Sequence, residues 1–237
     1  VHCNDWQTGL TPAYLQMMDQ PRARSVMTVH NIAFQGNFDR DWIKALEIPL
    51  SMFHMHGVEF HGNLSFLKSG LQYADRIVTV SPTYAHEIQA TEMGYGMQGL
   101  LTVRRLDVSG ILNGIDEDEW NPATDKHLEV NYDEHDLSKK TQGKLALQKR
   151  LGLEVNEQAP LLGVVSRLTF QKGLDLLLEC LPTLLENGAQ LAVLGSGDAE
   201  FERRYLQLAQ RYAGRVSVTI GFNEPLSHQI MAGADIF

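Results

Sequence analysis

The sequence is poor in cysteine and contains no long apolar run. Cys3 and Cys180 are its two cysteines among 237 residues, which is too few for a disulfide framework, so we expect a reducing compartment. Cys180 lies in a leucine-rich helical pattern, where we expect it to pack as a small apolar residue. No run approaches the roughly 20 apolar residues that a membrane-spanning helix needs, and we expect no membrane partner.

Basic residues are outnumbered by acidic ones. The chain has 20 Lys and Arg against 29 Asp and Glu, a formal net charge of −9, which disfavours nucleic acid as a main partner but allows a local cationic pocket. No strand is followed by the G-x-G-x-x-G fingerprint of dinucleotide-binding proteins, which disfavours a nicotinamide oxidoreductase. The hydrophobic content of 43% and charged content of 21% are typical of globular domains.

Short apolar, β-branched segments alternate with helical patterns along the chain, which is typical of α/β folds with parallel sheets. Strands are predicted over 1–4, 25–29, 76–80, 109–112, 161–165, 190–194 and 216–220, and helices over 8–18, 65–73, 81–91, 143–151, 174–187, 200–212 and 226–232. Residues 36–62 look irregular, and Pro182 predicts a kink or restart in its helix.

Composition shifts after Asp116 to an acidic, aperiodic stretch that contains Trp120 and Pro122. We interpret 117–142 as a linker between a first domain, 1–116, and a second domain, 143–237.

Three strand ends in the second domain carry residues suited to a nucleotide. Ser166, Arg167 and Lys172 follow the strand 161–165, and two cations near a helix start favour a diphosphate. Gly195 and Gly197 follow the next strand and would allow close backbone approach to a ligand. Gly221 and Phe222 follow the third, where an aromatic ring could stack on a base. Solvated loop charges, a tight turn and an aromatic packed on the sheet edge are the respective alternatives.

Several strings resemble bacterial glycogen synthase and plant starch synthase, in order and over essentially the whole chain. They are VHNIAFQG (Val29–Gly36), GVEFHGNLSFLKSGLQYAD (Gly57–Asp75), SPTYAHEI (Ser81–Ile88), YGMQGLL (Tyr95–Leu101), GILNGIDEDEWNP (Gly110–Pro122), VVSRLTFQKGLDLLLE (Val164–Glu179) and LGSGD (Leu194–Asp198). The resemblance implies two facing Rossmann-like domains of the GT-B type. It also implies transfer of glucose from ADP-glucose to the non-reducing end of an α-1,4-glucan such as glycogen or a starch primer, with retention and without metal or cofactor.

The resemblance also implies roles for individual residues. Arg167 and Lys172 match the pair on the donor phosphates, Asn113 matches an asparagine near the sugar, and Gly221 and Phe222 match the glycine–aromatic pair at the base. Ser166, Gly195 and Gly197 fall on the same donor side. His30 and Asn31 are candidates for the glucan side.

The beginning of the chain departs from one form of the family pattern. Residues 2–7 read HCNDWQ where many bacterial members have H-x-H-D-W-H, so Asn4 stands where those members place a histidine near the donor sugar. Plant-type members resemble this chain in having Asn-Asp-Trp. Asn4 can donate and accept hydrogen bonds but cannot carry a proton at neutral pH.

The family's lysine-glycine-glycine loop would precede Val1, and its glutamate-containing segment would follow Phe237. We therefore expect both domains to be truncated and the 237 residues alone to be inactive, with non-catalytic nucleotide-sugar or glucan binding as the alternative. The resemblance implies a bacterial cytoplasmic protein, or a plastid protein if plant-type. His54, His56 and His61 do not form a usual metal-ligand pattern, so no metal site is predicted.

Overall fold

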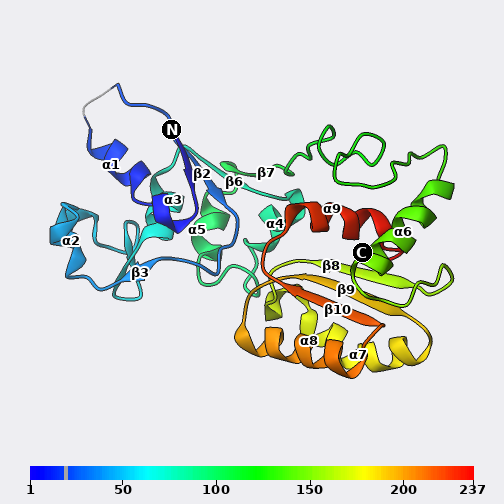
Figure 1. The fold of residues 1–237 in the computed structure, drawn as a ribbon. Coiled ribbons are helices and arrows are strands. Elements are labelled where there is room, and N and C mark those ends of the chain that lie inside the picture. Colours follow the sequence, from blue (N-terminus) through cyan, green and yellow to red (C-terminus); the bar gives the residue numbers. More distant parts are fainter. Residues whose placement is uncertain (19–20) are drawn as a thin grey trace. The chain divides into compact units, whose positions relative to one another are not determined.

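The computed structural model describes residues 1–18 and 21–237 of the chain. The chain divides into two compact units, Val1–Gly114 and Ile115–Phe237. Each unit contains its own parallel sheet, as the alternation of strands and helices predicts (Figure 1). Among the described residues no helix is long and apolar enough to cross a membrane.

The first unit is built on a four-stranded parallel sheet in the order β1-β2-β6-β7. Its strands are β1 (His2–Asn4), β2 (Val26–Val29), β6 (Arg76–Thr79) and β7 (Val108–Gly110). Buried side chains from β1, β2 and β6 form one core with the helices that follow the strands, including Cys3, Met27 and Ile77. The predicted strands of the first domain are thus confirmed, with ends shifted by one or two residues.

Two helices of the first unit begin at serine caps that are visible in the sequence. The side chain of Ser65 caps α3, and Ser81 caps α4 with Pro82 in the first turn, which satisfies free backbone N–H groups at each helix start. The helices are α1 (Thr11–Met17), α2 (Trp42–Ala45), α3 (Phe66–Tyr73), α4 (Pro82–Glu87) and α5 (Gln98–Val103), with short 3-10 turns at Trp6–Thr8 and Leu50–Met52.

Two predictions for the first unit are wrong. Residues 36–62 are not simply irregular, because β3 (Asn37–Phe38), β4 (Glu59–Phe60) and β5 (Asn63–Ser65) make a small antiparallel sheet in the order β3-β5-β4. The helix expected to run to residue 91 ends at Glu87. Strands of two or three residues show no alternation of apolar and polar side chains, so this sheet could not be predicted from the sequence.

The second unit has a three-stranded parallel sheet in the order β10-β9-β8. The strands are β8 (Leu161–Val165), β9 (Gln190–Gly195) and β10 (Val216–Ile220), and the helices are α6 (Ser138–Arg150), α7 (Leu174–Glu186), α8 (Ala199–Arg211) and α9 (Glu224–Gly233). A parallel bridge joins Leu162 to Ile236, so the last residues continue the sheet beside β8.

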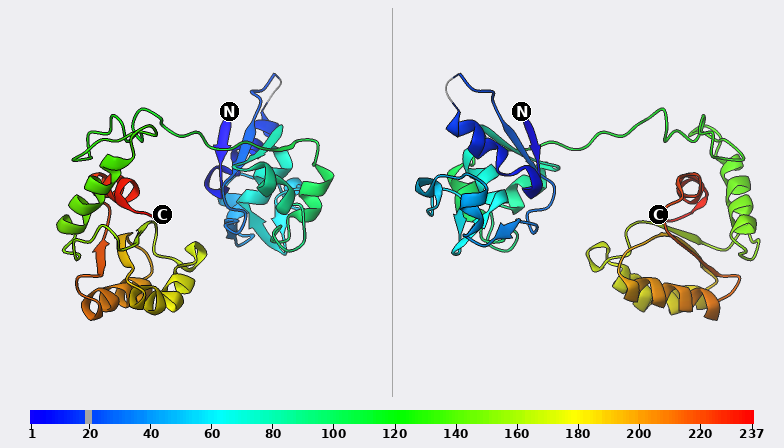
Figure 2. Two further views of the ribbon diagram at one scale, coloured as in Figure 1. Left: turned by 90° about the vertical axis from the view of Figure 1, so that its right-hand side faces the viewer. Right: turned by 60° about the vertical axis from the view of Figure 1, so that its left-hand side comes forward.

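Helices cover both faces of this sheet, as Figures 1 and 2 show. Because side chains alternate along a strand, Leu191 and Val193 of β9 pack with α7 and α8, whereas Ala192 and Leu194 pack with α6 and α9. All six residues of β9 are buried, as expected of a central parallel strand.

Three further expectations for this unit need correction. The helix predicted from residue 143 begins at Ser138, inside the stretch interpreted as linker. Pro182 does not restart its helix, because α7 is one continuous element from Leu174 to Glu186. Cys180 is exposed rather than packed, because it lies off the apolar stripe of α7 formed by Leu174, Leu178, Leu181 and Leu185.

Candidate functional site

The carboxyl ends of β8, β9 and β10 surround one pocket of about 350 Å³. Parallel strands end at a common edge of the sheet, where α/β proteins collect ligands. The pocket is lined by Trp120, Val165, Ser166, Arg167, Leu194, Gly195, Ser196, Gly221, Phe222 and Ser227. The structure thus brings together five of the residues predicted for the donor side: Ser166, Arg167, Gly195, Gly221 and Phe222.

Of the donor-side residues predicted in the second domain, Lys172 and Gly197 do not line this pocket. Lys172 ends a 3-10 turn, Phe170–Lys172, just before α7, and its side chain is exposed. Arg167 is exposed as well. Among the described residues neither cation has an ion pair or a side-chain hydrogen bond, so both charges are available to an anionic ligand.

Glycine is required at positions 195 and 197 by contacts between two loops, which could not be seen in the sequence. A Cβ added to Gly195 would lie 1.8 Å from the carbonyl oxygen of Ser166, and one added to Gly197 would lie 2.4 Å from that of Leu168. The backbone N–H of Leu168 donates to Ser196 O at 3.0 Å and that of Asp198 to Leu168 O at 2.9 Å. The two glycines thus let the loops after β8 and β9 lie against each other, and Gly197 itself does not line the pocket.

Phe222 is not packed against the sheet edge. Its side chain is 89% exposed, and the preceding Gly221 has φ +124°, a conformation that favours glycine. An exposed ring at the rim of a pocket is free to stack on a planar ligand. Of the two interpretations of this residue, the structure therefore disfavours simple packing.

The start of α8 is already compensated by acidic side chains. Glu200 and Glu202 lie in its first turn, and the N–H of Gly197 donates to Glu202 Oε1 at 2.8 Å. A helix N-terminus occupied in this way does not attract an anion. Positive charge near the pocket therefore comes from Arg167 and Lys172 rather than from α8.

In the first unit, Asn4 and His30 lie together at the ends of β1 and β2. A hydrogen bond of 3.0 Å joins His30 Nε2 to Asn4 Oδ1, and the N–H of His30 donates to Asp5 Oδ1 at 2.8 Å. Asn4 and His30 are both exposed. This pair can exchange hydrogen bonds with sugar hydroxyls.

Asn31 and Asn113 are not part of that pair. Asn31 Oδ1 accepts a hydrogen bond from the N–H of Ala33 at 3.0 Å, which is a local turn. Asn113 is exposed in the segment that ends the first unit, and in the described part of the chain its side chain makes no hydrogen bond.

The first unit also has a larger pocket, of about 680 Å³, which does not include Asn4 or His30. His56, Glu59, Phe60, His61, Lys68, Gln72 and Arg104 are among its lining residues. Lys68 is nearly buried, and this desolvation lowers the pKa of its ammonium group. Its Nζ donates to the carbonyl oxygens of Met55 and Glu59, so this lysine holds the loop before β4 in place.

Sequence reasoning missed Trp120, Ser196 and Ser227 as pocket residues. Ser196 could have been found, because it lies between the two glycines that were singled out. Trp120 and Ser227 could not have been found in this way. Trp120 lies in the stretch taken as linker, and Ser227 lies within α9, several residues along the sequence from the end of β10.

Comparison with a solved structure defines the class of the fold. The catalytic domain of starch synthase IV from Arabidopsis thaliana, bound to ADP and acarbose, superimposes with a TM-score of 0.91 at 32% identity, covering 99% of this chain and 50% of that one. Together with the two parallel sheets, this match confirms an α/β fold of the GT-B glycosyltransferase type.

Sequence comparisons find similar proteins of one kind. Residues 1–103 match the family model described as the starch synthase catalytic domain. The chain is 54% identical over 237 residues to the glycogen synthase of Nitrosomonas eutropha and 53% identical over 237 residues to that of Cellvibrio japonicus. Both matches include 100% of this chain but only 47% and 49% of the two relatives. The chain therefore spans about half the length of the curated relatives it matches. The resemblance to bacterial glycogen synthase and plant starch synthase is therefore confirmed.

Proposed function

We propose that the whole protein is a retaining glucosyltransferase that moves glucose from ADP-glucose to the non-reducing end of an α-1,4-glucan in glycogen or starch synthesis. The single observation that supports it is the pocket at the ends of β8, β9 and β10. There an arginine that has no ion pair within the described chain, two glycines and an exposed aromatic ring lie together. The glycogen synthase relatives and the ADP-bound starch synthase agree with this proposal.

The chemistry explains why such a pocket needs cations. Transfer breaks the bond between the anomeric carbon of glucose and the diphosphate oxygen. It forms a bond from that carbon to the 4-hydroxyl oxygen of the glucan, whose proton is released. Negative charge grows on the departing ADP, and Arg167 with Lys172 would stabilise it. Removing one such preorganised group typically lowers turnover about 100- to 1000-fold.

The other residues take supporting roles in this proposal. Phe222 would stack on the adenine, while Ser166 and the backbone at Gly195 and Gly221 would line the diphosphate and ribose. Asn4 and His30 would bind sugar hydroxyls in the first unit, with Asn4 acting through hydrogen bonds because an amide cannot carry a proton. Asn31, Asn113 and Gly197 remain proposed site residues on the family resemblance alone.

Calorimetric titration of the chain with ADP, UDP and NAD tests the ligand class. We expect saturable binding of ADP with the greatest affinity, and no binding of NAD. The Arg167→Ala variant should bind ADP at least tenfold more weakly, because a charge-assisted contact to phosphate is lost. Lys149→Ala serves as the matched control, since Lys149 is an exposed cation on α6 outside the pocket.

NAD binding without ADP binding would overturn the proposal in favour of an oxidoreductase. ADP binding by a whole protein that transfers no glucose would instead favour the second candidate, a nucleotide-sugar or glucan binder. That candidate is kept because the chain spans about half the length of its enzymatic relatives.

A further inference from the structure

His228, on α9, is a buried histidine whose ring is fixed from several sides. It is 1% exposed, and Asp125 Oδ2 lies 2.7 Å from its Nδ1. The indole of Trp120 stacks on the ring with centroids 3.7 Å apart and planes 7° apart, and His127 packs at 4.7 Å. These contacts leave the imidazole one orientation.

The other ring nitrogen of His228 has no partner. Nε2 is buried and makes no hydrogen bond among the described residues. A carboxylate oxygen can only accept, so the Nδ1–H of His228 donates to Asp125 and a neutral ring carries its lone pair on Nε2. An unsatisfied buried polar atom destabilises the folded state, so a ligand bound at Nε2 would relieve this cost.

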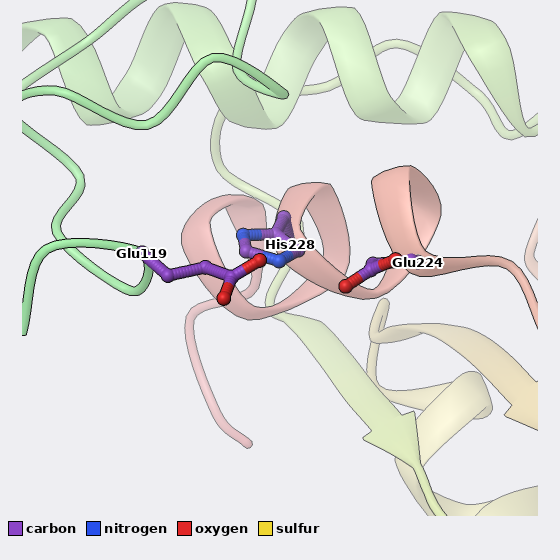
Figure 3. Close-up of side chains that lie close together, drawn as sticks. All are labelled: Glu119, Glu224 and His228. Carbon is purple, nitrogen blue, oxygen red and sulfur yellow. The ribbon is translucent and has the colours of Figure 1, made fainter. Parts of the chain in front are cut away.

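Two carboxylates lie beside the ring of His228. A ring nitrogen of His228 and one oxygen each of Glu119 and Glu224 lie within 4.8 Å of one another. Figure 3 shows the two glutamates reaching the histidine from different segments, one before α6 and one at the start of α9. Within the described chain neither carboxylate has a side-chain hydrogen bond or an ion-pair partner, so the oxygens of both are available to a cation.

We propose that His228 Nε2, Glu119 and Glu224 bind a divalent transition-metal ion of the Zn²⁺ type, with water completing the coordination. Zn²⁺ takes imidazole nitrogen and carboxylate oxygen together, whereas Mg²⁺ and Ca²⁺ prefer oxygen ligands alone. A carboxylate on the far nitrogen is the usual support of a metal-binding histidine, and Asp125 occupies that position.

The glutamates can adjust their positions to close around an ion. At bond lengths of about 2.1 Å, ligand atoms of a tetrahedral site lie about 3.4 Å apart, and the ligand atoms here lie within 4.8 Å of one another. Both glutamates are exposed, so their side chains can rotate inward while the buried imidazole stays fixed.

This ion ties the stretch around Glu119 to α9 beside the strand-end pocket. Trp120 and Ser227, the neighbours of Glu119 and His228, line that pocket. The site contains no residue assigned to glucosyl transfer, for which the family resemblance implies no metal. It is therefore structural, and it stands whether or not the proposed function is correct.

The test is calorimetric titration of chelator-treated protein with Zn²⁺, and with Mg²⁺ separately. We expect one saturable Zn²⁺ site that a tenfold excess of Mg²⁺ does not displace, and a thermal midpoint that rises with Zn²⁺ because the ion binds the folded state. Glu119→Gln and Glu224→Gln should each weaken Zn²⁺ binding at least tenfold, and the double variant should lose this site. Both positions are exposed, so the variants should fold.

Glu117→Gln is the matched control, since Glu117 is exposed, close in sequence and outside the cluster; it should bind Zn²⁺ as the unmodified chain does. Equal Zn²⁺ affinity in the double variant would show that ions bind elsewhere, for example at His54 and His56, and would overturn the proposal. So would an NMR spectrum with excess Zn²⁺ in which both nitrogens of His228 carry protons, because the ring would then donate to a glutamate instead.

Discussion

Replacing Phe222 by alanine separates ligand stacking from protein packing. The side chain is 89% exposed, so its removal uncovers no core, and we expect the free energy of unfolding to stay within about 0.5 kcal/mol of the original. Stacking of a base on an aromatic ring contributes roughly 1–3 kcal/mol. Phe222→Ala should therefore weaken ADP binding about 5- to 150-fold, whereas Phe222→Tyr should retain it.

Calorimetry with ADP measures the affinities, and thermal unfolding without ligand measures the stabilities. Phe170→Ala is the matched control, because Phe170 is 71% exposed in the same unit but does not line the pocket; its ADP affinity should be unchanged. Unchanged ADP affinity in Phe222→Ala would refute the stacking role. A large loss of stability in that variant would refute the claim that the ring is unpacked.

Three other predictions follow from local geometry and from the family. Gly195→Ala should destabilise the second unit by about 3 kcal/mol or more in a denaturant titration, because the added Cβ would lie 1.8 Å from Ser166 O. Gly143→Ala on α6 is the control, because among the described residues no atom lies within 4 Å of the added Cβ. It should be neutral or stabilising by up to about 1 kcal/mol in the same titration. Hydrogen bonds from Arg22, Arg24 and Ser25 hold the pKa of Asp75 well below its usual range, so the carboxylate stabilises the fold above about pH 4 and progressively less as pH falls. Asp75→Asn should cost roughly 2 kcal/mol at pH 7 and distinctly less at pH 2, and an equal loss at both would contradict the assignment. Residues 1–237 on their own should release no ADP from ADP-glucose in the presence of glycogen; clear glucan extension by them would be the contrary result.

Much of the second unit could be predicted because its signals are local. Each strand of five or six residues is apolar and is followed by an amphipathic helix, so β8 to β10 and their helices lie within a few residues of the predicted bounds. Parallel topology then brings Arg167, Gly195 and Phe222 to one edge, which is why a nucleotide pocket could be proposed from spacing alone.

What could not be predicted depends on contacts between distant residues. Gly195, at the end of β9, and Gly197, just beyond it, are required by the loop at Ser166–Leu168. This requirement is visible only when the two loops are side by side. The cluster at His228 joins Asp125 across 103 residues, and Glu119 lay in a stretch that composition marked as linker. The small sheet of β3, β4 and β5 has strands of two or three residues, too short for any periodicity.

The central claim, that Arg167 and Lys172 stabilise the departing ADP, is tested most directly by single-turnover transfer of labelled glucose from ADP-glucose to glycogen by the whole protein. We expect the unmodified protein to elongate the glucan, Arg167→Ala and Lys172→Ala each to slow the transfer step about 100- to 1000-fold, and Lys149→Ala to behave like the unmodified protein. Transfer at the unmodified rate in both the Arg167→Ala and the Lys172→Ala variant would contradict the account.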